Sequence, residues 1–183
     1  WIDVRSLRLQ SDRMERINTR PDTTQVYVKP EGSRSGQVYV YHRDLNGNYN
    51  IETLEGVNPF WQGDYGNVHF SFIPAGGRPI EGKDVYVYGE LTDYASNGLG
   101  KMQYNEATKR YETTLFLKQG YYNYTYITMP TNDTQAYPDF SATEGNDWTT
   151  ENNYIILVYY RPFGARADEL IGFAAVNSVF QMN

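Results

Sequence analysis

Cysteine is absent from this chain of 183 residues, which excludes disulfides, thiolate metal sites and a cysteine nucleophile. Histidine is scarce as well: His42 and His69 are the only two, and no G-x-S-x-G stretch supplies a nucleophile for either. We expect both histidines to be structural residues of strands. We predict no catalytic residue, no cofactor and no metal ligand, and therefore no enzyme activity.

Long apolar runs and an excess of basic residues are also missing. The longest apolar run, residues 154–160, falls far short of the roughly 20 residues that a membrane-spanning helix needs. The net charge of −6 argues against nucleic acid and anionic lipid, because phosphate groups are bound by clustered basic side chains. We predict no nucleic-acid partner and no direct membrane insertion. A closed membrane barrel is the rival architecture, but the polar stretch 97–110 leaves little length for its apolar band.

Aromatic side chains are abundant: they make up 16% of the sequence, and there are 18 tyrosines. Aromatic residues favour strands over helices. Strand-like patterns bounded by turn residues occur at residues 24–28, 37–42, 67–72, 84–91, 110–117, 121–127, 153–161 and 169–180. They predict an all-β fold, an antiparallel immunoglobulin-like sandwich of the early-set type. Residues 153–161 are apolar on both faces, which predicts a central strand, and residues 12–17 have the pattern of one helical turn.

A stretch rich in Gly and Pro, residues 56–66, predicts a linker or a long loop. We therefore expect residues 1–61 to be a strand-rich remnant of a preceding β-domain, and residues 62–183 to form the early-set immunoglobulin-like sandwich. The chain starts at Trp1 without Met, already in strand-like sequence. We expect it to be a processed product or the C-terminal fragment of a longer protein.

The stretch YYNYTYI concentrates tyrosines at residues 121–127. Tyr122, Tyr124 and Tyr126 share one face, because side chains alternate along a strand. Such a face can stack sugars or bases, or it can pack inside the sandwich with its hydroxyl groups at polar partners. We favour the buried interpretation, because most other strands of this sequence carry tyrosine pairs too.

The pair Asn46–Gly47 predicts a tight type I′ turn, since both residues tolerate a positive φ. It should join strand 37–42 to residues 49–54. The surrounding residues also resemble a calcium-binding loop, with Asp44 at its start and Glu55 at its end. The glycine lies two positions too early and no helices flank the loop, so we predict a hairpin without a metal.

The longest stretch without periodicity, residues 131–153, is acidic and contains aromatic residues. Loops of this length are often functional. We predict an ordered loop that binds a partner; a solvated connection is the alternative, and a pair of glycosidase carboxylates is a weaker one. The candidate partner-binding residues are Tyr94, Tyr137, Phe140 and Trp148.

Two family resemblances bear on these expectations. Residues 84–127 resemble the glycogen-binding carbohydrate modules, which are early-set immunoglobulin-like domains; Tyr94 lies at the turn where those modules have a tryptophan. This resemblance implies the sandwich fold, and it supplies the alternative function, a carbohydrate-binding module.

A second resemblance covers nearly the whole chain. The motifs that carry it, in order, are IDVRSLRLQSDRMERI, DLNGNYNI, GDYGNVHFSF, KMQYN, LKQGYYNYTYI, EGNDWTTENNYIILVYYR and ARADELIGFAAVNS. Together they resemble the C-terminal portion of the type IX secretion system plug proteins. The resemblance implies a non-enzymatic periplasmic protein of a Gram-negative bacterium, associated with the outer membrane. Its implied partner is the large outer-membrane translocon barrel, whose periplasmic opening it seals when no substrate is present.

Overall fold

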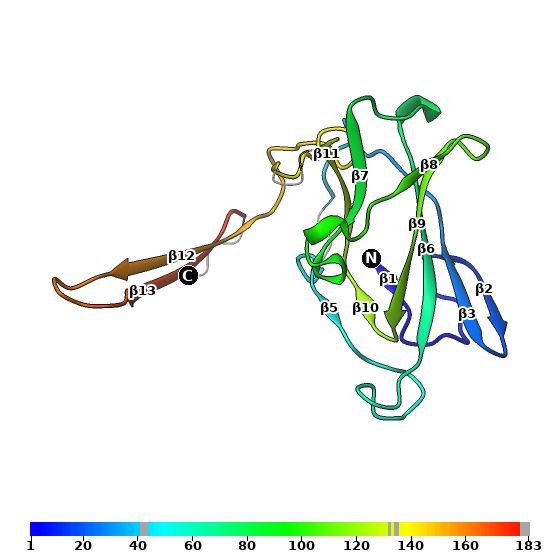
Figure 1. Cartoon of the computed structure of the whole chain (residues 1–183), viewed down its shortest axis with the longest axis horizontal. Helices are drawn as coiled ribbons and strands as arrows, with labels where there is room; N and C mark the ends of the chain where they lie inside the picture. Colours follow the sequence, from blue (N-terminus) through cyan, green and yellow to red (C-terminus); the bar gives the residue numbers. More distant parts are fainter. Residues whose placement is uncertain (41–43, 132, 134–135, 180–183) are drawn as a thin grey trace. The chain divides into compact units, whose positions relative to one another are not determined.

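A computed structural model of the chain describes residues 1–40, 44–131, 133 and 136–179 (Figure 1). The strands are β1 (Ile2–Asp3), β2 (Met14–Arg20), β3 (Thr23–Val28), β4 (Glu31–Gly32), β5 (Tyr49–Asn50), β6 (Tyr65–Ile73), β7 (Lys83–Tyr88), β8 (Gln103–Asn105), β9 (Arg110–Lys118), β10 (Tyr121–Tyr122), β11 (Thr125–Pro130), β12 (Asn153–Tyr160) and β13 (Glu169–Asn177). Short 3₁₀ turns form at η1 (Ala75–Gly77), η2 (Glu90–Thr92) and η3 (Ser96–Gly98). In this part of the chain no helix has the length and apolar character needed to cross a membrane. The predicted all-β sandwich fold is confirmed.

The chain divides into two compact units, one made of residues 1–37 and 43–146 and the other of residues 38–42 and 147–183. The first unit is the sandwich, and the second contains the β12–β13 hairpin. This division differs from the predicted boundary at residues 61 and 62. Strand β3 pairs with β6, so strands from both sides of that boundary share one sheet. The Gly- and Pro-rich stretch is a loop, as predicted, but it connects strands of the same sandwich.

One layer of the sandwich is a sheet with the strand order β2-β3-β6-β9-β8, in which β4 also pairs with β6 (Figure 1). Its neighbours are antiparallel except that β3 and β4 run parallel to β6. The opposing strands form the antiparallel pair β7–β11 and the small antiparallel sheet β1-β10-β5.

The core forms where alternating side chains of these layers meet. Val68, Phe70 and Phe72 of β6 point inward and are at most 1% exposed, as their spacing predicts. From the opposing layer, Val87 of β7 joins the same apolar cluster. The Tyr126 ring of β11 lies 5.0 Å from that of Phe72, so the aromatic rings bridge the two layers.

The tyrosine-rich stretch lies inside this sandwich, which confirms the buried interpretation. Tyr122 and Tyr126 are buried, and the half-buried Tyr124 packs edge-on against Phe70 at 4.9 Å between ring centroids. The Tyr124 hydroxyl donates to Glu31 Oε2 at 2.9 Å, which satisfies its polar end. On the other face of β11, Ile127 is buried in a second apolar cluster, so this strand is covered on both sides.

Two local predictions fail in the N-terminal part. Residues 14–17 of the predicted helical turn belong to strand β2, which pairs with β3, so that prediction is wrong: a weak local pattern yields to sheet pairing. Residues 37–40 form no strand, and residues 41–42 of that predicted strand, including His42, lie outside the described residues.

The Asn46–Gly47 turn forms as predicted, but the hairpin around it does not. Both residues have a positive φ, of 52° and 81°, and the Asn48 amide donates to the Leu45 carbonyl at 3.0 Å. After the turn, the strand covers only residues 49–50, and it pairs with β10. The sequence thus predicts the turn correctly and the partner of the following strand incorrectly.

Candidate docking surface

Strands β12 and β13 form an antiparallel two-stranded ribbon, residues 153–177, drawn in orange to red in Figure 1. The register has a bulge between Val158 and Tyr159, and Arg161 and Asp168 form an ion pair at 2.7 Å in the connecting loop. Among the described residues, no other strand pairs with β12 or β13. The prediction that residues 153–161 form a central strand is therefore wrong for this part of the chain.

The ribbon exposes an unusual amount of apolar surface. Its large apolar side chains are 46% to 108% exposed: Tyr154, Ile155, Ile156, Leu157, Val158, Tyr159, Tyr160, Phe163, Leu170, Ile171, Phe173 and Val176. Side chains of this number and size present on the order of 1,000 Å² of apolar surface, whereas the largest patch of a typical monomer measures a few hundred Å². In soluble proteins, apolar patches of this size are typical of surfaces that bind a protein, a membrane or a ligand.

Both faces of the ribbon are apolar. Tyr154, Ile156 and Val158 of β12 share one face, and Ile155 and Leu157 lie on the other. Strands with one face in water alternate between polar and apolar residues, whereas strands buried on both faces are apolar throughout. The sequence signal for burial is therefore present in β12, whose large apolar side chains are nevertheless 46% to 67% exposed.

The outer edges of the ribbon lack the charges that protect other exposed edges. Strand β12 has no charged residue, and β13 has only Glu169 at its start. By contrast, the edge strand β2 of the sandwich carries Glu15, Arg16 and Arg20. Natural proteins use such charges to prevent unwanted strand pairing. The ribbon edges are chemically open to a further strand.

The structure brings two of the four predicted partner-binding residues together. Tyr94 and Phe140 both contact the Tyr88 ring edge-on, at 5.5 and 6.0 Å between centroids. Phe140 is half-buried in the second apolar cluster. Tyr137 is 92% exposed in the first unit and Trp148 is 95% exposed in the second. The partner-binding role of all four stays a prediction.

Part of the predicted loop 131–153 is ordered against the sandwich. The backbones of Thr128 and Asp139 exchange two hydrogen bonds, at 2.8 and 2.9 Å. The Lys83 ammonium, 2.5 Å from the Asp139 carboxylate, lowers the pKa of that carboxyl to about 2. The buried Thr143 hydroxyl donates to the Tyr126 carbonyl at 2.5 Å. Residues 132, 134 and 135 of this loop lie outside the described residues.

A small hollow of about 200 Å³ lies beside Tyr94, lined in part by Tyr88, Asp44 and Asn123. The Asp44 carboxylate accepts from the Asn46 amide at 2.9 Å, and the Asn123 side chain accepts from the Leu45 amide at 3.0 Å. These polar atoms therefore bond to the chain itself. Pockets for small ligands usually have at least about 300 Å³, so the hollow suits at most a small part of a saccharide.

A larger groove of about 620 Å³ follows the outer face of the six-stranded sheet. Across it, Arg16, Tyr27, His69 and Thr114 stand side by side on neighbouring strands. The Arg16 guanidinium lies 3.9 Å from the Tyr27 ring centroid, and the His69 ring stacks on Tyr27 at 4.3 Å. Because β3 lies between β2 and β6, the tyrosine ring is held between these two groups. It is not free to stack a sugar.

His69 lies within a strand, as predicted, and both of its ring nitrogens have partners. The Nε2 atom lies 2.6 Å from Gln25 Oε1, and the Nδ1 atom lies 2.8 Å from Thr114 Oγ1. Burial, aided by the nearby Arg16 charge, lowers the pKa of His69. A neutral imidazole fits these contacts, with Nε2–H donating to Gln25 and Nδ1 accepting from Thr114.

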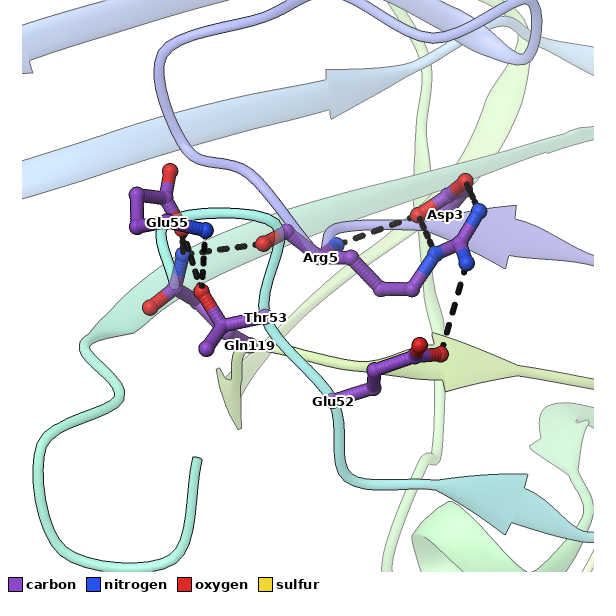
Figure 2. A network of polar contacts seen from close by, with 6 residues as sticks. All are labelled: Asp3, Arg5, Glu52, Thr53, Glu55 and Gln119. Carbon is purple, nitrogen blue, oxygen red and sulfur yellow. Dashed lines mark hydrogen bonds and ion pairs between the residues drawn. The ribbon is translucent and has the colours of Figure 1, made fainter. Parts of the chain in front are cut away.

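A polar network ties the N-terminal strand to the loop after β5 (Figure 2). The Arg5 guanidinium donates to both Asp3 oxygens, at 3.0 and 2.7 Å, and to Glu52 Oε2 at 3.3 Å. Burial tends to raise the pKa of Asp3, but the hydrogen bonds and charge of Arg5 outweigh it and lower that pKa. These carboxylates are engaged within the chain, which is typical of a structural brace.

Gln119 and Glu55 form the second half of this network (Figure 2). The buried Gln119 amide donates to Glu55 Oε2 at 2.6 Å and to the Arg5 carbonyl at 3.1 Å, and its oxygen accepts from the Asp64 amide at 2.9 Å. Glu55 also accepts from the hydroxyls of Thr53 and Ser6. Its carboxylate, placed by sequence at the end of a calcium loop, is thus surrounded by protein donors.

Among solved structures, the chain has a relative that is described as a hypothetical protein. No family model and no curated protein matches the chain. It is similar to the crystal structure of a hypothetical protein from Parabacteroides merdae ATCC 43184, with 35% sequence identity and a TM-score of 0.84. The match covers 94% of this chain and 42% of that protein, so the chain spans less than half of its length. The uncovered share of this chain is smaller than the ribbon, so the likeness includes part of the ribbon.

Proposed function

We propose that this chain is a non-enzymatic docking part of a type IX secretion plug protein. In this role it binds the periplasmic side of the large outer-membrane translocon barrel and seals the opening when no substrate is present. The identity of the partner is inferred from the ordered sequence motifs that resemble the plug proteins. The exposed apolar ribbon is the observation that supports docking.

The size of the ribbon surface is adequate for such a role. A standard protein–protein interface takes about 800 Å² from each partner, and the ribbon offers apolar surface of that order. Its tyrosines and Phe173 are residue types enriched at interface hot spots and in the apolar centre of interfaces. Docking of this kind needs no reacting group. Within the described residues, no group of three or more His, Asp or Glu side chains could hold a metal ion.

A binding measurement tests the proposal. The chain is immobilised and the purified translocon barrel is passed over it in detergent, with a translocon-free detergent blank as the reference. We expect saturable binding with a Kd below about 1 μM. In cell fractionation, we expect the native protein to be released with the periplasmic fraction and then to be retained on outer membranes. If binding is not saturable at concentrations of tens of micromolar, the docking proposal is refuted.

A carbohydrate-binding module is the second candidate function. The hollow beside Tyr94, which is lined by the three tyrosines Tyr88, Tyr94 and Tyr124, is the observation that favours it. Chromatography on glucan resin separates the two candidates. Strong retention that is lost on Tyr94→Ala or Trp148→Ala supports carbohydrate binding, whereas elution in the void volume removes it.

A further inference from the structure

We infer that the hollow beside Tyr94 binds a small organic cation, a quaternary ammonium group such as that of choline. Every described residue that lines this hollow of about 200 Å³ belongs to the compact unit that contains residues 43–146, so the site lies within a single unit. The inference goes beyond the docking proposal and does not depend on it. It rests on the aromatic rings, the charge and the hydrogen bonds of the hollow.

Two tyrosine rings form a wall that suits a cation. Tyr88 and Tyr94 meet edge to face, with their ring centroids 5.5 Å apart and their planes at 66°. The corner of such a pair is bounded by a face of each ring, and ring faces carry the negative part of the aromatic quadrupole. A cation close to these faces is attracted to them, and walls of aromatic rings are a recurrent means of binding quaternary ammonium groups.

The formal charge in the lining is negative. Among the described residues that line the hollow, Asp44 is the only charged one. Its Oδ1 atom accepts from the Asn46 amide at 2.9 Å, whereas its Oδ2 atom has no hydrogen-bond partner in the described part of the chain. Glu90 and Asp93 adjoin lining residues along the chain and add to the negative potential. This pattern disfavours an anion and favours a cation.

A metal ion fits the hollow less well than an organic cation does. Calcium takes about six to eight oxygen ligands, commonly including several carboxylates. Asp44 is the only carboxylate among the described lining residues, and the described part of the chain has no group of three or more acidic or histidine side chains that could hold a metal. Two aromatic rings and one carboxylate instead match a cation with an apolar surface.

A saccharide also fits less well, because its hydroxyl groups need free polar partners. The Asn123 side-chain oxygen already accepts from the Leu45 amide at 3.0 Å. The Tyr94 hydroxyl already donates to Asn48 Oδ1 at 3.2 Å. A quaternary ammonium group has no N–H group and therefore needs no hydrogen-bond acceptor. The engaged polar atoms of the hollow do not hinder its binding.

Backbone hydrogen bonds fix the shape of the hollow in the free chain. The Glu90 amide donates to the Gly47 carbonyl at 2.8 Å, which ties the loop after β7 to the turn before β5. The Asn123 amide donates to the Asn48 carbonyl at 3.0 Å, which ties the same turn to the segment before β11. A site that is formed in advance costs little ordering entropy on binding. Weak but specific binding is therefore expected from these few groups.

A comparison of two ligands on the unchanged chain tests the inference. The probes are choline and the neutral alcohol in which a tert-butyl group replaces its trimethylammonium group, and binding is followed by NMR on a nitrogen-labelled chain. We expect choline to bind with a Kd of about 0.1–1 mM and the neutral alcohol to bind at least about fivefold more weakly. Equal affinities overturn the inference, and so does the absence of saturable choline binding below about 20 mM.

Variants test whether choline binds in the hollow. Tyr94→Leu removes an aromatic ring that is 45% exposed, and Asp44→Asn removes the charge while it keeps an oxygen for the Asn46 amide. We expect Tyr94→Leu to weaken choline binding at least about fivefold and Asp44→Asn to weaken it about threefold. Unchanged binding in both variants overturns the inference.

Two control variants separate the aromatic ring from other effects. Tyr94→Phe keeps the ring, and Tyr137→Leu removes an exposed tyrosine of the same unit. Each should change the Kd for choline by less than about twofold. A circular dichroism melt of each variant verifies the sandwich. The comparison of choline with its neutral analogue stays decisive if a variant fails to fold, because it uses the unchanged chain.

Further measurements distinguish the sources of the ammonium group. Cosedimentation with phosphatidylcholine vesicles that free choline reverses identifies a lipid headgroup, whereas choline binding without cosedimentation identifies a free solute; both results support the inference. Binding of a linear glucan oligosaccharide that Tyr94→Leu abolishes, in a chain that does not bind choline, assigns the hollow to the carbohydrate candidate and overturns the inference. The docking proposal is tested separately, since its assay uses the translocon barrel.

Discussion

Replacing Tyr126 with alanine tests the sandwich core most sharply. The ring is buried, lies 5.0 Å from Phe72 and meets Tyr124 edge-on at 5.6 Å. Truncating a large aromatic side chain in a packed core lowers the free energy of unfolding by about 3–5 kcal/mol. The Thr143 hydroxyl, which donates to the Tyr126 backbone carbonyl, keeps its partner in the variant, so the effect reports on the ring.

Tyr137→Ala is the matched control, because it removes the same ring from a residue that is 92% exposed. Urea unfolding followed by circular dichroism is the assay. With a slope near 2 kcal/mol/M, Tyr126→Ala should lower the midpoint by about 2 M, while Tyr137→Ala should change the free energy of unfolding by less than about 0.5 kcal/mol. Equal effects at the two positions would refute the burial of the tyrosine-rich stretch.

Other predictions concern the polar network, the ion pair at Asp139 and calcium. Gln119→Ala should destabilise by about 1–3 kcal/mol in urea titration, because it leaves buried polar partners unsatisfied; an unchanged midpoint would show that the network is dispensable. Asp139 has a lowered pKa of about 2, against an ordinary 3.8, so its contribution to stability is present above pH 3.8 and is lost as the pH falls towards 2. The melting midpoints of the unchanged chain and of Asp139→Asn should therefore differ at pH 5 and converge near pH 2; a difference that stays constant with pH contradicts this. Calcium should leave the melting midpoint unchanged, whereas a rise that Asp44→Ala abolishes would reveal a site at the Asn46–Gly47 turn.

The alternation of apolar and polar residues predicts strands well where one face is buried and the other is exposed to solvent. Strand β6 is the example: Val68, Phe70 and Phe72 point inward as their spacing predicts. Strand pairing is harder to predict from the sequence, because it depends on contacts between segments that lie far apart along the chain. The parallel pairing of β3 with β6 joins residues that the sequence pattern assigns to different domains. Likewise, pairing with β3 turns residues 14–17 into a strand despite their helical pattern.

Only part of the candidate docking surface can be predicted from the sequence. The apolar run in β12 predicts burial on both faces, but its large apolar side chains are 46% to 67% exposed, and among the described residues the strand pairs only with β13. Sequence pattern does not distinguish a strand buried in its own fold from one buried in a partner, because both need the same side chains. The aromatic candidates Tyr94 and Phe140 share contacts with Tyr88, but nothing in their spacing indicates that partner.

Hydrogen–deuterium exchange of residues 153–177, measured with and without the purified translocon barrel, tests the central claim most directly. In the free chain, we expect fast exchange from both strands, because a two-stranded hairpin is marginally stable in water. In the complex, amides of β12 and β13 should become strongly protected, while protection of the sandwich core strand β6 stays unchanged. Saturable binding that leaves the exchange of both ribbon strands as fast as in the free chain would contradict docking through the ribbon.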